Sequence, residues 1–219
     1  MTLSPRLLKG GLVRVDPKSS RVLSVIALQY NPDTLSRTLA VQASGTGGGR
    51  DGGDRSQALR LRGAAVETIK LEAEIDATDH LEHPDANADA VHLGIHPQLA
   101  ALESLVQPRA DDLQRNNTLA GSGHLEVLPI ETPLTLFVWS RQRVVPVRVT
   151  DLSITEEAFD VNLNPIRAKV SLGLRVLSVD DLGFHHRGGT LFMGYLRNKE
   201  GLAAKATSAP LSALGLEGI

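Results

Sequence analysis

The sequence predicts a mainly β protein with one or two flanking helices. Residues 66–75 and 166–176 alternate between apolar and polar side chains, which is the pattern of a strand with one buried face. Residues 97–106 instead have the apolar spacing of a helix that packs on a core. Because 42% of the residues are hydrophobic and only 3% are aromatic, we expect a sizeable core of aliphatic side chains.

The composition argues against several classes of function. The chain of 219 residues has no cysteine, which excludes disulfides, thiolate catalysis and cysteine-ligated metal centres. A dedicated nucleic-acid or membrane-surface binder would have a strong basic excess, whereas here 23 basic residues face 25 acidic ones. No apolar run reaches the ~18–20 residues of a membrane span, and residues 1–16 are too polar for a signal peptide. We therefore expect a cytoplasmic protein with neither nucleic acid nor membrane as a partner.

The first elements are expected to form a β-hairpin. Residues 7–15 and 21–29 are rich in β-forming side chains, and residues 16–20 between them have turn composition. Pro32 lacks a backbone N–H and biases Asn31 away from helix, so the ladder should stop there.

The next segment is expected to be extended and then mobile. Residues 34–42 have the composition of a further strand or arm. Residues 43–54 are glycine-rich and predict a flexible loop. A phosphate-binding loop would need a Gly-Lys-Ser/Thr sequence opening a helix, or a buried strand before it and a helix after it, and neither context is present.

Residues 66–75 could be a helix or a strand, because Glu, Lys and Ala are frequent there. The period of two fits better than 3.6, so we predict a strand. Its apolar face carries Ile69, Leu71, Ala73 and Ile75, and its polar face carries Thr68, Lys70, Glu72 and Glu74.

The segment from residue 76 to residue 96 is acidic and rich in histidine. His80 and His83, and likewise His92 and His96, have spacings that could ligate zinc. A solvated connector or a subunit contact would have the same composition, and no His-Glu-x-x-His pattern occurs. A metal-dependent hydrolase using residues 80–96 is therefore the alternative function, which metal analysis of the purified protein would test.

The helix predicted at residues 97–106 begins with Pro97, which suits a first turn, and is closed by Pro108. Its apolar stripe consists of Leu99, Leu102, Leu105 and Val106. Residues 111–117 could add another helical turn.

The second half of the chain is expected to contain the longest strands. Residues 134–140 and 144–150 form a predicted hairpin, in which Pro146 indicates an edge strand or a bulge. In residues 166–176 one face is apolar, and the other carries Arg167, Lys169, Ser171 and Arg175. We predict one β domain over residues 1–182. Residues 183–219 would form a helical extension, with a helix at 190–199 that docks through Leu191, Phe192 and Tyr195, and a tail.

No residue pattern indicates catalysis. There is no Gly-x-Ser-x-Gly elbow, and Glu156 and Glu157 are neighbours in a predicted strand, so their side chains should point to opposite faces. We assign no catalytic, cofactor-binding or metal-ligating residue, and expect a protein that is not an enzyme.

Six segments of the chain carry a resemblance to a known family. They are residues 30–37 (YNPDTLSR), 66–79 (VETIKLEAEIDATD), 95–103 (IHPQLAALE), 133–139 (PLTLFVW), 153–160 (SITEEAFD) and 163–168 (LNPIRA). Together they resemble baseplate spike-adaptor and tube-initiator proteins of phage-tail-like contractile injection systems. The resemblance extends over roughly residues 8 to 200, and the order of the segments is more specific than any one alone.

The resemblance implies a tube-protein-like antiparallel β-barrel with a flanking helix. It also implies a structural role, in which six copies form a ring that connects the central spike to the inner tube and initiates tube assembly. The partners would be the chain itself, the spike protein, the inner tube protein and other baseplate subunits. Some relatives carry a C-terminal lysin-motif domain, and no such domain is recognised after Leu182. This leaves open which layer of the baseplate or tube the chain occupies.

Two sets of residues are candidates for subunit contacts. Prolines that end a ladder mark sheet margins, so the first set is Tyr30, Asn31 and Pro32 together with Asn164 and Pro165.

The second set is the basic face of the last long strand, formed by Arg167, Lys169 and Arg175. These side chains could line a lumen or meet an acidic neighbouring ring.

Overall fold

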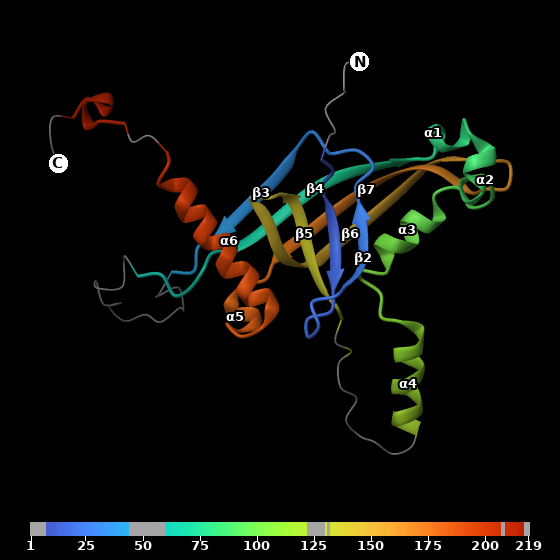
Figure 1. Ribbon diagram of the computed structural model, residues 1–219, viewed down its shortest axis with the longest axis horizontal. Coiled ribbons are helices and arrows are strands. Elements are labelled where there is room, and N and C mark those ends of the chain that lie inside the picture. The colour runs from blue at the N-terminus through green and yellow to red at the C-terminus, as the bar shows by residue number, and fades with distance from the viewer. Residues whose placement is uncertain (1–7, 44–59, 122–129, 131, 207–208, 217–219) are drawn as a thin grey trace, which may run out of the picture.

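A computed structural model describes residues 8–43, 60–121, 130, 132–206 and 209–216 (Figure 1). The strands are β1 (Gly11–Val15), β2 (Val22–Ala27), β3 (Leu35–Ala40), β4 (Val66–Asp76), β5 (Leu134–Ser140), β6 (Arg143–Phe159) and β7 (Pro165–Val176). The helices are α1 (Thr78–Leu81), η2 (Pro84–Ala86), α2 (Ala88–Leu93), α3 (His96–Glu103), α4 (Ala110–Gly121), α5 (Val179–Leu182), α6 (Arg187–Ala203) and η3 (Leu211–Leu214). The predicted mobile loop at 43–54 lies outside the described residues from residue 44 onward.

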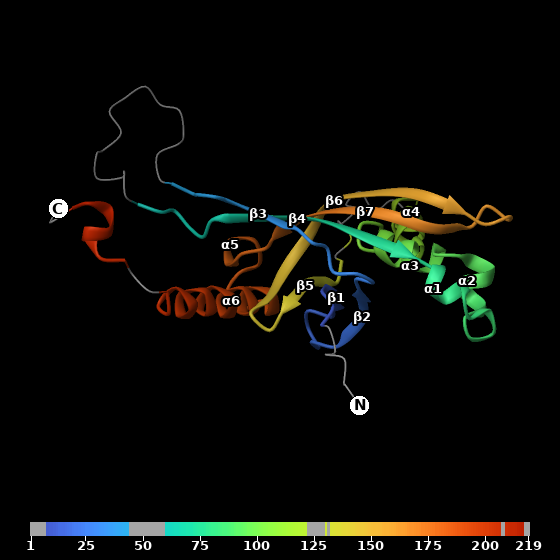
Figure 2. The ribbon, with the colours of Figure 1, turned by 90° about the horizontal axis from the view of Figure 1, so that it is seen from above.

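The strands form one antiparallel sheet in the order β2-β1-β5-β6-β7-β4-β3. This confirms the predicted class, mainly β with flanking helices. The expected closure into a barrel does not occur in the described pairing, because β2 and β3 are the two ends of the order and do not pair with each other. Figure 2 shows the sheet doubled over, with β3, β4 and β7 in one layer, β1, β2 and β5 in the other, and β6 crossing between them.

A side chain and a helix occupy the side of the sheet where a barrel ladder would close. The amide of Gln29, just after β2, donates to the carbonyl of Asp76 at 2.6 Å and accepts from the Asp76 N–H at 2.9 Å. It thereby bonds to the end of β4 as a strand would. Helix α3 adds Leu99 and Leu102 to the core beside this junction. The backbone edges of β2 and β3 therefore do not pair with each other.

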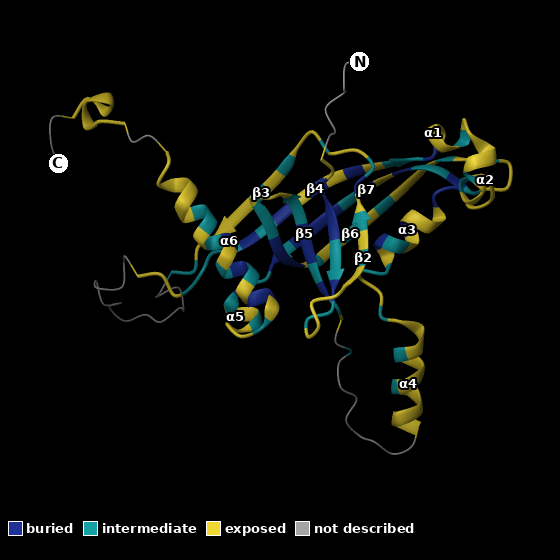
Figure 3. Cartoon of the chain, in the orientation of Figure 1, coloured by how far each residue is buried: buried dark blue, intermediate teal, exposed yellow. Residues whose placement is uncertain are grey.

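Figure 3 shows the buried residues concentrated in the strands of the doubled sheet, and these residues form the core. Ile69, Leu71 and Ala73 of β4 are buried, so the strand predicted from the period of two is confirmed. In β7 the predicted apolar face is inside: Ala168, Val170, Leu172, Leu174 and Val176 are all buried.

Pro146 lies inside a central strand, which corrects the prediction of an edge strand or a bulge. β6 pairs with β5 near its start and with β7 over the rest of its length, and the register shifts occur elsewhere. The N–H and C=O of one strand residue point to the same side. The Pro146 carbonyl accepts from Leu177 N, just beyond the end of β7. The N–H that Pro146 lacks would therefore point beyond the end of the β7 ladder, where no ladder hydrogen bond is needed.

Several helices lie where the long strands begin or stop, and α3 lies beside β2 (Figure 1). Helices α1 and α2 and the 3-10 turn η2 cap the end where β4 stops, and α6 lies at the other end (Figure 1). Helix α4 has no buried residue and projects away from the sheet (Figure 3). None of the helices in the described residues is long and apolar enough to cross a membrane.

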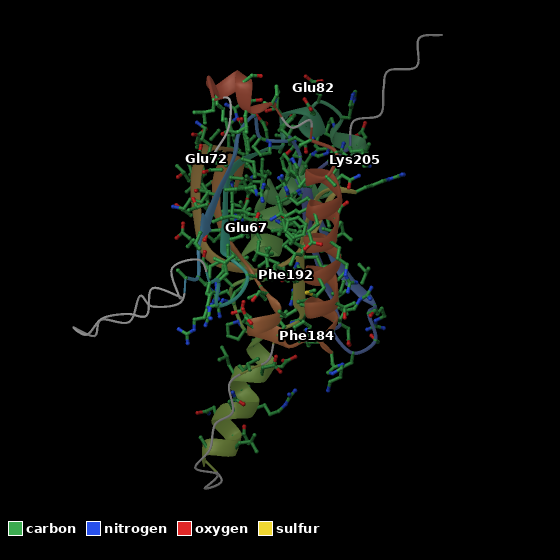
Figure 4. The ribbon with its side chains drawn as sticks, turned by 90° about the vertical axis from the view of Figure 1, so that its left-hand side faces the viewer. Glu67, Glu72, Glu82, Phe184, Phe192 and Lys205 are labelled. Atoms are coloured by element: carbon green, nitrogen blue, oxygen red, sulfur yellow. The ribbon has the colours of Figure 1, made fainter. Side chains whose placement is uncertain are left out.

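Helix α6 is fixed to the sheet by a buried ionic cluster around Glu67, which lies between the strands and α6 in Figure 4. The Glu67 carboxylate, only 3% exposed, accepts from Arg37 Nε at 2.7 Å, from Lys199 Nζ at 2.8 Å and from the Tyr195 hydroxyl. Burial opposes the charge of Glu67, but the bonds from Arg37 and Lys199 outweigh it and lower its pKa. Phe192 and Tyr195 are buried, in agreement with the predicted docking of this helix.

We expect the substitution Glu67→Gln to destabilise the fold by about 2 kcal/mol, because it leaves Arg37 and Lys199 without their shared anion. Both cations are partly exposed, which limits the loss. Urea unfolding would measure the difference. The control is Glu72→Gln on the same strand, which should change stability by less than about 0.5 kcal/mol. Equal effects of the two substitutions would contradict an anchoring role for Glu67.

Candidate assembly surface

The first predicted margin, residues 30–32, lies directly after β2 and is held by side-chain hydrogen bonds. The Asn31 side chain accepts from Gly10 N and donates to the carbonyl of Leu8, both at 2.8 Å. These bonds continue the pairing with the β1 segment beyond the point where the strand ends. Asn31 is exposed and Pro32 half-buried, so the margin is ordered and partly accessible.

Tyr30 in this margin is 46% exposed and points to acidic residues. Its hydroxyl lies 3.4 Å from Asp79 Oδ2 and accepts from Gln29 Nε2 at 3.3 Å. Desolvation, and then the negative charges of Asp79 and Asp76, raise the pKa of Tyr30. The phenol is therefore a protonated hydrogen-bond donor at neutral pH.

The predicted basic residues of β7 are all paired with carboxylates of this same chain. Arg167 Nε lies 2.7 Å from Asp76 Oδ2, and Lys169 Nζ lies 2.7 Å from Glu157 Oε1. The bonds from these carboxylates raise the pKa values of Arg167 and Lys169, which keeps both cationic.

Arg175 lies further along β7 and pairs with Asp181 at 2.7 Å, beside helix α5. Its neighbours across the sheet are Thr68 and Arg148.

The structure brings one margin and part of the basic face together. A surface cavity of about 370 Å³ is lined by residues 30–34, by Glu72 and Glu74 of β4, and by Lys169. Arg167 adjoins it through Glu74, at 3.7 Å. Arg175 is not among its lining residues. Tyr30 and Lys169, far apart in the sequence, are thus on one polar surface.

The second predicted margin is at the turn between β6 and β7, and its two residues differ in exposure. The Asn164 amide donates to Asp160 Oδ2 at 2.8 Å and to the His92 carbonyl at 3.2 Å. Pro165 is buried, and its carbonyl accepts from Ile95 N. Asn164 is therefore the accessible one of the two.

The histidines of the acidic segment are spread over α1, its flanking turn, α2 and α3. In the described ranges of the chain, no group of three or more His, Asp or Glu side chains is arranged to hold a metal ion. The metal-dependent alternative therefore has no ligand set among these residues.

Two features of the structure were not predicted from the sequence. The Glu67 cluster was missed, although Glu67 is in phase with Ile69 and Leu71 and so had to point inward. The doubling of the sheet, which brings residues 30–34 beside β4 and β7, depends on long-range pairing and has no local signal.

No family model matches the chain, and no curated protein does. Among solved structures, the chain is similar to one from the tail of an empty GTA particle with C6 symmetry, at 14% identity and a TM-score of 0.27. It is also similar to one from the virion of a native gene transfer agent (GTA) particle, at 12% identity and a TM-score of 0.26. Each match covers 76% of this chain and 90% of the other.

We expect Gln29→Ala to open the junction between β2 and β4, because Asp76 would lose both of its bonds to the Gln29 amide. The expected loss of stability is about 1–3 kcal/mol, and exchange of the Asp76 amide hydrogen should become faster. Gln98→Ala on α3 is the control, since Gln98 has no hydrogen bond of this kind in the described structure. Unchanged exchange at Asp76 would show that Gln29 does not hold the junction.

The stability of the fold should also decrease in acid, because Asp76 becomes protonated. Burial opposes the Asp76 charge, but hydrogen bonds from Thr78 and Arg167 outweigh it and lower its pKa below 3.8. A lowered folded-state pKa adds stability above the unfolded value, and this stability is lost as the pH falls below it. Unfolding measured between pH 7 and pH 2.5 should show wild type losing more stability than Asp76→Asn below about pH 4. Parallel curves would contradict the assignment.

Proposed function

We propose that this chain is a structural, ring-forming subunit of the baseplate or inner tube of a phage-tail-like contractile injection system. In this role, copies of the chain assemble with one another, connect the central spike to the inner tube and initiate tube assembly. The proposal is supported by the segment resemblance over roughly residues 8 to 200 and by an antiparallel sheet with flanking helices.

The observation that carries the proposal is that β2 and β3 are the edge strands, the two ends of the sheet, in the described part of the chain. An exposed edge strand is a template for pairing with another chain, and monomeric proteins usually protect it. The β2 end exposes Val22 and Val25, and the β3 end exposes Leu39 and, just beyond the strand, Val41. Because the two ends differ, contact of one with the other is head-to-tail, which produces a ring when the rotation closes.

The candidate contact residues fit this arrangement to different degrees. Tyr30 and Asn31 are exposed beside the β2 end, and Pro32 fixes the direction of the chain there. Asn164 is accessible at the β6–β7 turn, whereas for the buried Pro165 we propose an indirect role in holding that turn. Arg167, Lys169 and Arg175 would meet a neighbouring ring by sharing the carboxylates that they now contact.

The titratable groups support a structural role rather than an enzymatic one. Perturbed pKa values in a cleft often indicate catalysis. Here the lowered pKa values of Asp16 and Asp160 arise from turns that their carboxylates cap, and those of Glu67 and Asp76 from groups that join elements of the fold. Each of these shifts is explained by a contact that maintains the fold.

Negative-stain microscopy of the purified chain, alone and mixed with tube and spike proteins, tests the proposal. We expect rings, or nucleation of tubes, and a strict monomer that joins no particle would refute the assembly role.

We further expect Lys169→Glu to raise the protein concentration needed for stacking of rings and tube assembly by about tenfold or more, because it puts a like charge beside Glu157 and Glu74 on the surface that would meet a neighbouring ring. The matched control is Lys70→Glu on β4, which has no carboxylate partner in the described structure. Unchanged assembly of Lys169→Glu would exclude this residue from the contact.

A further inference from the structure

The turn between β6 and β7 exposes an unusual amount of apolar surface. We call residues 159–164 the hairpin tip. Val161 is 98% exposed, Leu163 78% and Phe159 49%. Single exposed apolar residues are normal on protein surfaces, but three in one six-residue turn indicate a contact site.

The tip is rigid rather than a loose loop. The Asp160 carboxylate accepts from the N–H of Asn162 at 2.7 Å, from the N–H of Asn164 at 2.8 Å, and from the Asn164 side chain. Leu163 has φ = +65°, a left-handed conformation that a leucine rarely adopts. Strain of this kind persists where the surroundings impose it, and it is frequent at functional sites. A turn fixed in this way presents Val161 and Leu163 with little entropy left to lose on binding.

A groove elsewhere on the chain matches the tip in chemistry. It has a volume of about 310 Å³ and lies between β2, β4 and α3. Its walls include Val25, Ala27, Leu28, Ile75 and Ala101. Five consecutive residues of its lining, 25–29, belong to β2 or directly follow it, so an occupant would lie along an open end of the sheet.

The segments that carry the two features differ in charge. Residues 8–29, which form the β1–β2 hairpin, contain four cationic side chains and one acidic one, Asp16, which caps its own turn. The groove lining itself contains one charged side chain, Glu74 of β4. The tip lies beside α2, to which Asn164 is hydrogen-bonded (Figure 1). No lysine or arginine occurs between Lys70 and Arg109, so the segment from α1 to α2 is acidic.

We infer that the hairpin tip of one copy seats in the β2–α3 groove of a second copy. This rests on the proposed assembly role and adds a contact beside the β2 edge: an apolar plug enters an apolar groove, and the acidic segment next to the tip approaches the basic hairpin. Plug and groove are different surfaces of one chain, so the contact is head-to-tail.

Cross-linking tests this directly, because the chain has no cysteine of its own. Full-length Val161→Cys is mixed with full-length Ala101→Cys, and in a second mixture with Ala27→Cys, and each mixture is oxidised. We expect disulfide-linked pairs containing one copy of each variant from at least one groove position, since a disulfide forms only when the two Cβ atoms approach within ~4.5 Å. Leu214→Cys, a similarly exposed leucine on η3, replaces Val161→Cys in the control and should give at most background.

A second measurement does not depend on disulfide geometry. The double variant Val161→Ser and Leu163→Ser should weaken self-association by roughly tenfold to a hundredfold in sedimentation experiments, through lost apolar burial. Leu211→Ser with Leu214→Ser is the control. Rings with neither cross-link nor weakening would overturn the tip-to-groove contact alone and leave the assembly role intact. A wild-type chain that is monomeric at all concentrations would overturn both. Cross-linked pairs without rings would support the contact and count against a closed ring.

Discussion

The pairing of β6 with two different neighbours is the constraint on which the rest of the structure depends. Near its start β6 bonds to β5, and from Val147 onward it bonds to β7. Register shifts at Val149/Asp151 and beyond let the strand bend and twist as it changes partner. The two layers of the sheet are thus one continuous ladder, and the aliphatic core fills the space between them.

A sheet that doubles over without closing has two edge strands, whose outer backbone groups lack a strand partner. In this chain Gln29 and Asn31 extend the hydrogen bonding past the ends of strands, and α3 covers the gap beside β2. In the described part of the chain the side chains replace a ladder at these points, and β2 and β3 remain the edge strands of the sheet.

The charged residues divide by whether they have partners. Glu67 and the basic residues of β7 are neutralised within the chain, where they join β-strands to one another and to helices. The acids of the α1–α2 segment and the bases of the β1–β2 hairpin instead belong to different segments of a chain whose net charge is only −2.

The sequence by itself determined the strands and their inward faces, because a period of two fixes which side chains of β4 and β7 share a face whatever the partner. It also determined α3 and the docking of α6 through Phe192 and Tyr195. Only the tertiary structure decided what depends on long-range pairing. The strand order left the sheet open, put Pro146 in a central strand at a point where no donor is needed, and brought Tyr30 beside Lys169. It also gave Glu67, a polar residue in an apolar phase, cations from β3 and α6. Such partners lie up to 132 residues away in the chain. A local pattern involves only residues that are close in the sequence, so it cannot specify these partners.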